Sequence, residues 1–438
     1  MQSIPVVVET IYRKTNVSHL KKGIWLYFYL LIFEGALRKW VLPGLAQPLL
    51  IVRDPVAAWL IFVALRDGVW KPNRKVALMW GVTILAFITA LLVGHGNIMV
   101  ALYGMRITLL HFPIIFIIGT VFDKEDVLRI GKMMLWVNIA MTILVAAQFY
   151  SPQGAWVNRG IGGDAEGSGF TGAAGFFRVP GTFSFSNGLS LFYGFSAAYI
   201  FYFWLTRKES IIHIPRNLLL GSTIALLAAI PLSISRTVLF EVVASLLFML
   251  FISGKNPKVI KQIAGGAIGG IFILTILNFF TFFQTATLAF TTRFTNADTS
   301  EGGASGTFGR FLKGVFGAFY DGNATYLGYG LGMGTNAGSQ LMTGKVSFLI
   351  SEGEWGRLIG EMGFTLGLIM ILIRVGFIFG VTINAWRSIS LGNMLPWMLI
   401  SFGFLNVMQG QWAQPTALGF SVIVGGLIVA AFKTNRKN

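Results

Sequence analysis

The sequence predicts an all-α polytopic membrane protein with about twelve transmembrane helices. Hydrophobic residues make up 55% of the 438 residues, charged residues only 12%, and the mean hydropathy is +0.70. A soluble domain carries roughly a quarter charged residues. Apolar stretches of about 18–25 residues, long enough to cross a bilayer as helices, recur along almost the whole chain. The lysines and arginines concentrate in the short connections between these stretches.

The apolar stretches follow one another with polar or basic residues between them. In order they are 24–42, 49–66, 76–93, 99–122, 127–150, 184–205, 216–235, 236–253, 263–283, 358–383, 394–410 and 415–432. Each is long enough for one helical crossing, so we expect helices 1–9 within 24–283 and helices 10–12 within 358–432. The leading segment 1–23 is of mixed polarity and shows no small-residue cleavage site of a signal peptide.

The basic residues predict the orientation of the bundle. If the N-terminus lies inside, the inner connections are 66–75, 123–132, 206–216, 254–262 and 384–388. Together with segment 1–23 and the tail 433–438, they hold most of the 34 lysines and arginines, as the positive-inside rule requires. We therefore expect both termini in the cytoplasm. The net charge of +17 is then a topology signal, with membrane lipids as partners and no nucleic acid.

The sequence lacks the residues and motifs that several common kinds of metal and cofactor site require. There is no cysteine, which excludes disulfides and thiolate metal sites. The four histidines, at 19, 95, 111 and 213, show no metal-ligand spacing, and no phosphate-binding GxxxxGK[ST] motif is present. We expect no metal and no nucleotide or redox cofactor.

Two long connections, 151–183 and 284–357, fall on the outer face in this topology. Loops longer than about 12–15 residues are usually functional or disordered. The second lies between helices 9 and 10, and its aromatic and apolar residues predict a partly helical cap at the membrane surface. Its glycine cluster "GYGLGMGTNAG" (328–338) could let the backbone approach a ligand, or serve tight turns only.

Several basic residues lie at the outer edge of apolar stretches. Such a group is costly in a bilayer and is a functional hypothesis by default. Arg38 and Lys39 in "GALRKWVLP" are expected to extend toward the membrane interface. Arg53 could pair with Asp54 or with another carboxylate.

Three further arginines predict an anion-binding site on the outer face. Arg236 stands in the tight turn "SISRTVLF", Arg178 leads "RVPGTFSFSNGLSLF", and Arg310 lies in the large loop. Arginine grips phosphate groups with a planar, bidentate fork, so the predicted ligand is a diphosphate. The alternative is that the outer-edge arginines pair with carboxylates of the chain itself, at Glu34, Glu241, Glu352 or Glu361.

The stretch "SEGEWGRLIGE" (351–361) places four charged residues directly before a long apolar run. They are Glu352, Glu354, Arg357 and Glu361. Acidic residues in a first helical turn are favoured by the helix dipole, which is the simpler interpretation. The dipole alone does not account for Arg357 among the acids or for a carboxylate one turn deeper, so an acid–base site is the other interpretation.

Four stretches, in this order, resemble landmarks of the O-antigen polymerase and ligase family. "RVPGTFSFSNGLS" resembles its R-x-x-G-T-F-x-x-P-N-x-L motif, and "LSISRTVL" resembles its SR turn. "GRFLKGVFGAF" with "YLGYGLGMGTN" resembles its large periplasmic loop, and "SEGEWGRLIGEMGFTLGL" resembles the helix that closes this loop. The resemblance covers about residues 175–370, whereas the N-terminal half matches in hydropathy only.

The resemblance implies a metal-independent glycosyltransferase in the bacterial inner membrane. Such proteins transfer a glycan from undecaprenyl diphosphate to an acceptor hydroxyl on the periplasmic face, and Arg178, Arg236 and Arg310 would replace a cation at the diphosphate. A polymerase of lipid-linked repeat units, working with a chain-length regulator, is the first interpretation. A ligase that transfers to a lipid or protein acceptor is the nearer alternative.

This chain departs from the family at the position of its activating histidine, which Glu352 occupies. A glutamate can also serve as general base, so Glu352 or Glu354 would activate the acceptor. Arg357 would hold the base or a phosphate, and Glu361 would orient an arginine from inside the bundle. The departure weakens the ligase interpretation.

Two further classes compete with an enzyme. A flippase or other transporter of lipid-linked oligosaccharides often shows repeated halves, but no repeat is visible and the outer loops differ strongly in length. A non-catalytic assembly scaffold would not explain why arginines are retained in the apolar stretches, where a charge is costly.

Overall fold

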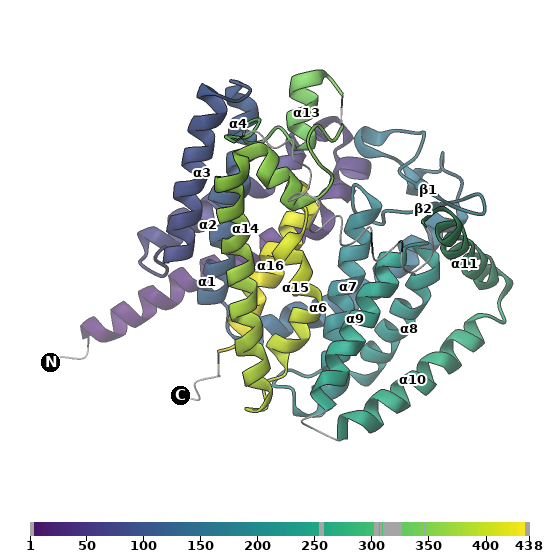
Figure 1. The fold of residues 1–438 in the computed structure, drawn as a ribbon. Coiled ribbons are helices and arrows are strands. Elements are labelled where there is room, and N and C mark those ends of the chain that lie inside the picture. The colour runs from purple at the N-terminus through teal and green to yellow at the C-terminus, as the bar shows by residue number, and fades with distance from the viewer. Residues whose placement is uncertain are drawn as a thin grey trace.

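The structure is a computed structural model that describes residues 4–253, 258–301, 306, 309, 326–345 and 347–433. It is mainly helical, with one small β-hairpin (Figure 1). The helices are α1 Ile4–Ala36, α2 Arg53–Arg66, α3 Arg74–Leu92, α4 Ile98–Arg106, α5 Phe112–Val121, α6 Lys124–Tyr150, α7 Ser186–Thr206, α8 Arg216–Leu232, α9 Arg236–Ser253, α10 Lys258–Leu277, α11 Thr281–Glu301, α13 Asn336–Thr343, α14 Glu354–Ile389, α15 Leu395–Gln409 and α16 Pro415–Ala431. The hairpin pairs β1 Phe170–Ala173 with β2 Phe176–Arg178 in antiparallel register.

Helices occupy all of the predicted apolar stretches, and many are long enough for a membrane. Within the described ranges, six helical segments are long and apolar enough to span one, and the bent pair α10–α11 would make a seventh. The six comprise α2 with the turn before it, α3, α4 with α5, α6, α7 and α14. Three shorter apolar helices, α8, α15 and α16, accompany them. The protein is therefore a mostly helical, membrane-embedded protein, as predicted.

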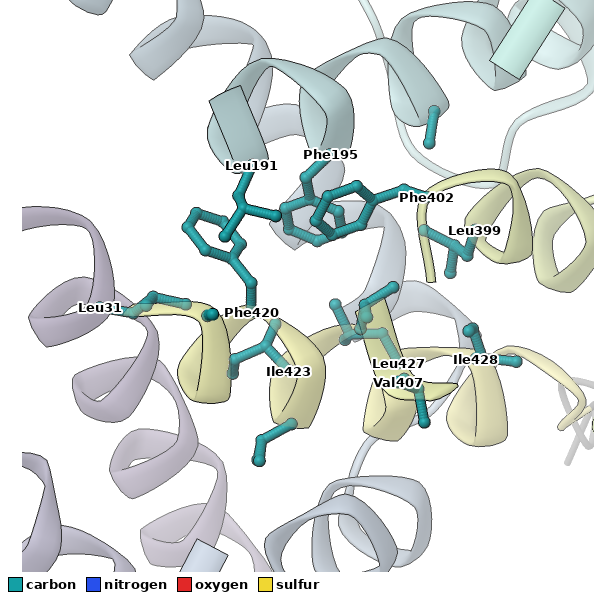
Figure 2. Close-up of a cluster of buried hydrophobic side chains, with 14 of the residues drawn as sticks. Leu31, Leu191, Phe195, Leu399, Phe402, Val407, Phe420, Ile423, Leu427 and Ile428 are labelled. Atoms are coloured by element: carbon teal, nitrogen blue, oxygen red, sulfur yellow. The ribbon is translucent and has the colours of Figure 1, made fainter. Parts of the chain in front are cut away.

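The core of the bundle is built around α16, which is apolar on all sides. Figure 2 shows Phe420, Ile423 and Leu427 of this helix between side chains of α1, α7 and α15. Phe420 lies 6.2 Å from Phe195 of α7 and 6.1 Å from Phe402 of α15, between ring centroids. A helix that is hydrophobic all round belongs in the interior, and α16 accordingly holds together segments from both halves of the chain.

Polar contacts tie the chain ends together at one end of the bundle. The ammonium of Lys21 in α1 lies 3.1 Å from Asp123 and 2.5 Å from Asp126, which form a capping box at the start of α6. The Lys433 ammonium donates to the carbonyls of Thr120 and Phe122, 2.8 Å away in the latter case. These contacts bring together segment 1–23, the connection 123–132 and the tail, which the charge pattern predicts on the same face.

The chain departs from the predicted boundaries after α10. That helix ends at Leu277 and α11 begins at Thr281, with a bend of 112° between them. The sequence predicts one straight span over 263–283, because the aromatic residues of this stretch continue the apolar run. Instead, α11 takes up the first part of the predicted cap 284–357, and most of 302–325 lies outside the described residues.

Candidate functional site

The stretch 351–361 includes the first residues of α14, which begins at Glu354 and is broken two residues after Glu361, at Gly363. Gly363 has φ +75° and ψ 168°, which is not helical and which side-chain-bearing residues rarely adopt. The carbonyl groups of Gly360 and Glu361, at the break, accept hydrogen bonds from the backbone N–H groups of Tyr329 and Gly330, at 2.7 Å and 3.0 Å. Another segment of the chain thus satisfies the backbone groups that the break sets free.

That segment belongs to the predicted glycine cluster. Gly328 has φ +77°, and a Cβ at this residue would collide with the carbonyl of Glu361. A Cβ at Gly363 would collide with the carbonyl of Tyr326 in the same way. The glycines therefore let one backbone segment approach another. The sequence left open approach to a ligand or tight turns only, and at Gly328 the structure shows a third use, close approach to the protein's own helix.

The broken helix carries a buried network of acidic and basic side chains. Arg357 donates from Nε and Nη2 to the carboxylate of Glu354, at 3.0 Å and 2.8 Å, and from Nη1 to Glu361 at 2.6 Å. The second oxygen of Glu361 accepts from the backbone N–H of Gly334 at 2.8 Å. All three side chains are at most 5% exposed, so their charges are paired in the interior of the protein.

Arg374, which the sequence reading did not single out, completes this network. Its Nη1 donates to Glu354 at 2.7 Å, while Nε and Nη2 donate to the carbonyls of Val407 and Gly410. The guanidinium also lies 3.9 Å from the ring centroid of Trp412. A charged residue inside the predicted span 358–383 was the available signal, because ionisable residues at that depth usually have a specific partner.

Glu352 has a different environment from its neighbours. Its side chain is exposed, and it lines a small pocket together with Glu354, Arg357 and Gln411. The side chain of Gln411 donates to the backbone carbonyl of Glu352 at 2.6 Å, which ties the connection after α15 to the start of α14. The pocket holds about 10 Å³, roughly the space of one water molecule.

The structure gives different environments to Glu352 and Glu354, which the sequence left as alternative candidates for the general base. The carboxylate of Glu354 receives three hydrogen bonds from two guanidinium groups. These contacts occupy the oxygens of a side chain that is itself buried. Glu352 is the exposed carboxylate of the two, whereas Glu354 is buried and holds Arg357 and Arg374 in place.

The predicted anion site draws on a different part of the fold, the hairpin β1–β2. Arg178 ends β2, and its Nε donates to the carbonyl of Thr171 at 3.2 Å. Its guanidinium lies 4.6 Å from the ring centroid of Phe170 across the hairpin. These contacts fix a half-buried arginine on a short, stiff element.

Arg236 follows a strained turn that packs against this hairpin. Ile234 has φ +48°, which is rare for a β-branched residue, and its side chain lies next to Gly172 of the hairpin. Ser235 is fixed by a 2.9 Å hydrogen bond to Ser190 of α7. Strained backbone of this kind is costly and concentrates at functional sites. The turn places Arg236, the first residue of α9, beside the hairpin.

A third arginine, Arg293 of α11, joins these two. Burial lowers the pKa of Arg178, and the positive charges of Arg293 and Arg236 lower it further. Arg293 and Arg236 are therefore close enough to Arg178 for their charges to act on it, and all three side chains are half-buried. Arg178 and Arg236 lie near each other, and their shared role in binding an anion stays a prediction. Arg310 lies outside the described residues, and Arg293 was missed because it stands within the loop without a motif.

The structure corrects the expectation for Arg38 and Lys39. Both are buried, in a π-helical turn, Leu37–Val41, that follows α1. Arg38 donates to Ser184 at 3.0 Å, and Lys39 donates to the carbonyls of Gly181 and Phe183 at 2.6 Å and 2.9 Å. They do not extend to the membrane interface, because the "VPGTFS" segment folds back over α1 and offers them hydrogen-bond acceptors.

The remaining outer-edge arginines pair with carboxylates of the chain. Arg53 lies 3.6 Å from Glu34, and Arg106 lies 2.9 Å from Asp54. Asp54 also contacts the ring of His111 at 3.0 Å, in a second π-helical turn, Ile107–His111. For Arg53 the alternative of internal pairing holds, with Glu34 in place of its neighbour Asp54.

The first turns of α7 link the arginine cluster to the pocket. Ser190 binds the turn that precedes Arg236, as described above, and Asn187 donates to Gln414 at 3.4 Å. Gln414 lines the same pocket as Glu352. The arginine cluster and the carboxylate network therefore lie at the same end of α7.

Comparisons with known proteins identify no relative of this chain. No protein-family model matches the chain, and no curated protein or solved structure matches it significantly.

Proposed function

We propose that the protein is a metal-independent glycosyltransferase that polymerises lipid-linked polysaccharide repeat units on the periplasmic face of the bacterial inner membrane. In this proposal all twelve helical stretches span the membrane, both termini are cytoplasmic, and undecaprenyl-diphosphate-linked glycans are donor and acceptor. The observation that carries it is the convergence of Arg178, Arg236 and Arg293 from three separate elements.

The arginine cluster supports a diphosphate as the group that is bound. Arg178 is half-buried, and the positive charges of Arg293 and Arg236 repel its guanidinium and lower its pKa. A diphosphate would relieve this repulsion and could accept paired hydrogen bonds from each planar fork. Arg293 is added to this proposed site, and the predicted contribution of Arg310, which lies outside the described residues, stays a prediction.

The reaction follows from the two halves of the site. The hydroxyl oxygen of the acceptor glycan attacks the anomeric carbon of the donor, and the bond from that carbon to the phosphate oxygen breaks. Glu352 takes the hydroxyl proton as general base. Undecaprenyl diphosphate leaves with its negative charge on the arginines, which stabilise charge as it develops on the leaving oxygen.

The proposal is tested with purified protein and lipid-linked repeat units, measuring the length and yield of polymer. Arg236→Lys keeps the charge but loses the bidentate fork, and one charge-assisted hydrogen bond contributes about 1.5–3 kcal/mol, so we expect at least about a tenfold loss of turnover. Arg159→Lys, at an exposed position of the loop 151–183, is the control and should retain full activity. Normal turnover of Arg236→Lys would refute its role in phosphate binding.

A deletion strain separates the proposed polymerase from its alternatives. Loss of a polymerase leaves undecaprenyl-linked single repeat units on the periplasmic side. A ligase defect would leave already polymerised chains on the carrier, and a flippase defect would leave single units on the cytoplasmic side. Either of the latter two results would contradict the proposal.

A further inference from the structure

A second cavity lies far along α14 from the broken end described above. It is a cleft of about 490 Å³ between the start of α3, the middle of α5 and the second half of α14. Binding sites for small molecules commonly measure about 300–1,000 Å³. The glycan-transfer proposal makes no use of this cleft.

The floor of the cleft is apolar and open. Phe116 of α5 and Phe377 of α14 form it, with ring centroids 5.5 Å apart. Gly376 and Gly380 lie one turn apart on α14, and a Cβ at either residue would meet no atom within 4 Å. The absence of side chains there leaves a groove along the helix that extends for about 6 Å.

The rim of the cleft is basic. Arg74 and Lys75 open α3 and are exposed, and no acidic residue lines the cleft. Within the described part of the chain, Arg74 has no ion-pair partner. The Lys75 ammonium lies 3.4 Å from the carbonyl oxygen of Gly376 and 5.4 Å from the ring centroid of Phe377, so it reaches over the floor without meeting a carboxylate.

We propose that this cleft binds one anionic glycerophospholipid of the surrounding bilayer. The phosphate would lie between Arg74 and Lys75, and part of an acyl chain would lie over Phe116 and Phe377. Basic pockets between transmembrane helices bind lipid head groups by this combination of charge and apolar surface. A free phosphate ion would leave the apolar floor unused, and a neutral lipid would leave both cations without a counter-ion.

The cleft also lies where a basic connection meets the apolar surface of the helices. It opens where α3 begins, next to the basic connection 66–75, and its floor extends into the apolar part of α14. A lipid held there would pack against both α3 and α14. The binding of this lipid does not depend on which reaction the protein catalyses.

The test is native mass spectrometry of the full-length protein in detergent, titrated separately with phosphatidylglycerol and phosphatidylcholine. We expect one phosphatidylglycerol to be retained in clear preference to phosphatidylcholine. A basic residue near a membrane surface contributes about 1 kcal/mol to the binding of anionic lipid, so Arg74→Gln with Lys75→Gln should weaken retention roughly thirtyfold. Gly380→Leu, which fills the groove, should weaken retention of the lipid while the charges remain.

The control variant is Arg207→Gln with Lys208→Gln, which removes the same charge from another connection with the same predicted orientation. It should retain phosphatidylglycerol like the wild type. Equal retention of both lipids by the wild type, or equal loss in the control, would refute the proposal. If inorganic phosphate displaces the bound lipid at millimolar concentration and binds equally well to Gly380→Leu, the site is one for a free anion, and the lipid assignment is wrong.

Discussion

Glu352 and Glu354 stand two residues apart, yet neutralising Glu354 should destabilise the protein and neutralising Glu352 should leave its stability unchanged. Glu354→Gln removes the negative charge from a carboxylate that two buried guanidinium groups contact through three hydrogen bonds of 2.7–3.0 Å. Glu361 still pairs with Arg357, but Arg374 loses its only carboxylate partner within the described residues. Glu352→Gln changes an exposed side chain and leaves every one of these contacts in place.

The cost of the first substitution follows from the burial of the network. Removing one partner of a buried ion pair destabilises a protein by about 3–5 kcal/mol. Unfolding entropies of about 2.1 cal/mol/K per residue give roughly 0.9 kcal/mol/K for a chain of this length, so the melting temperature should fall by about 3–5 °C. For Glu352→Gln we expect no change beyond about 0.5 kcal/mol, as is usual for a surface position.

The assay combines thermal unfolding in detergent with polymer formation from lipid-linked repeat units. Glu352→Gln should keep the wild-type melting temperature and lose about 10²–10⁴-fold in rate, the usual contribution of a general base. Glu354→Gln should lower both the melting temperature and the activity. If Glu354→Gln melts like the wild type, the buried network does not stabilise the fold, and if Glu352→Gln stays fully active, it is not the base.

Two further predictions concern the break in α14 and the orientation of the protein. Gly363→Ala should reduce stability by more than 1 kcal/mol, because the residue has a positive φ and faces a backbone carbonyl, whereas Gly269→Ala, in an open helical position of α10, should be neutral or stabilising by about 0.5–1 kcal/mol in the same melting assay. Since the chain has no cysteine, Glu166→Cys should react with an impermeant thiol reagent in intact spheroplasts and Lys208→Cys only after lysis; the reverse pattern would invert the proposed topology.

The sequence predicted the helices well and their interruptions poorly. Long apolar runs locate helices because each must bury its surface in lipid or in the protein. The two π-helical turns, Leu37–Val41 and Ile107–His111, leave no trace in that pattern, and neither does the bend after Leu277. At the two π-helical turns, side chains meet partners distant in sequence, Gly181 for Lys39 and Asp54 for His111, and the apolar pattern does not record such partners.

For the candidate site, the sequence by itself determined which residue types were present and at which edge of the bundle. It placed arginines and glutamates beside apolar stretches, where a charge requires a partner. Only the tertiary structure decided the partners: Arg38 and Lys39 turned inward, Arg374 joined Glu354, and Arg293 joined Arg178. The physical reason is that the cost of burying a charge is a property of the residue, whereas the hydrogen bonds and ion pairs that offset it come from whichever segments the fold brings within about 3 Å.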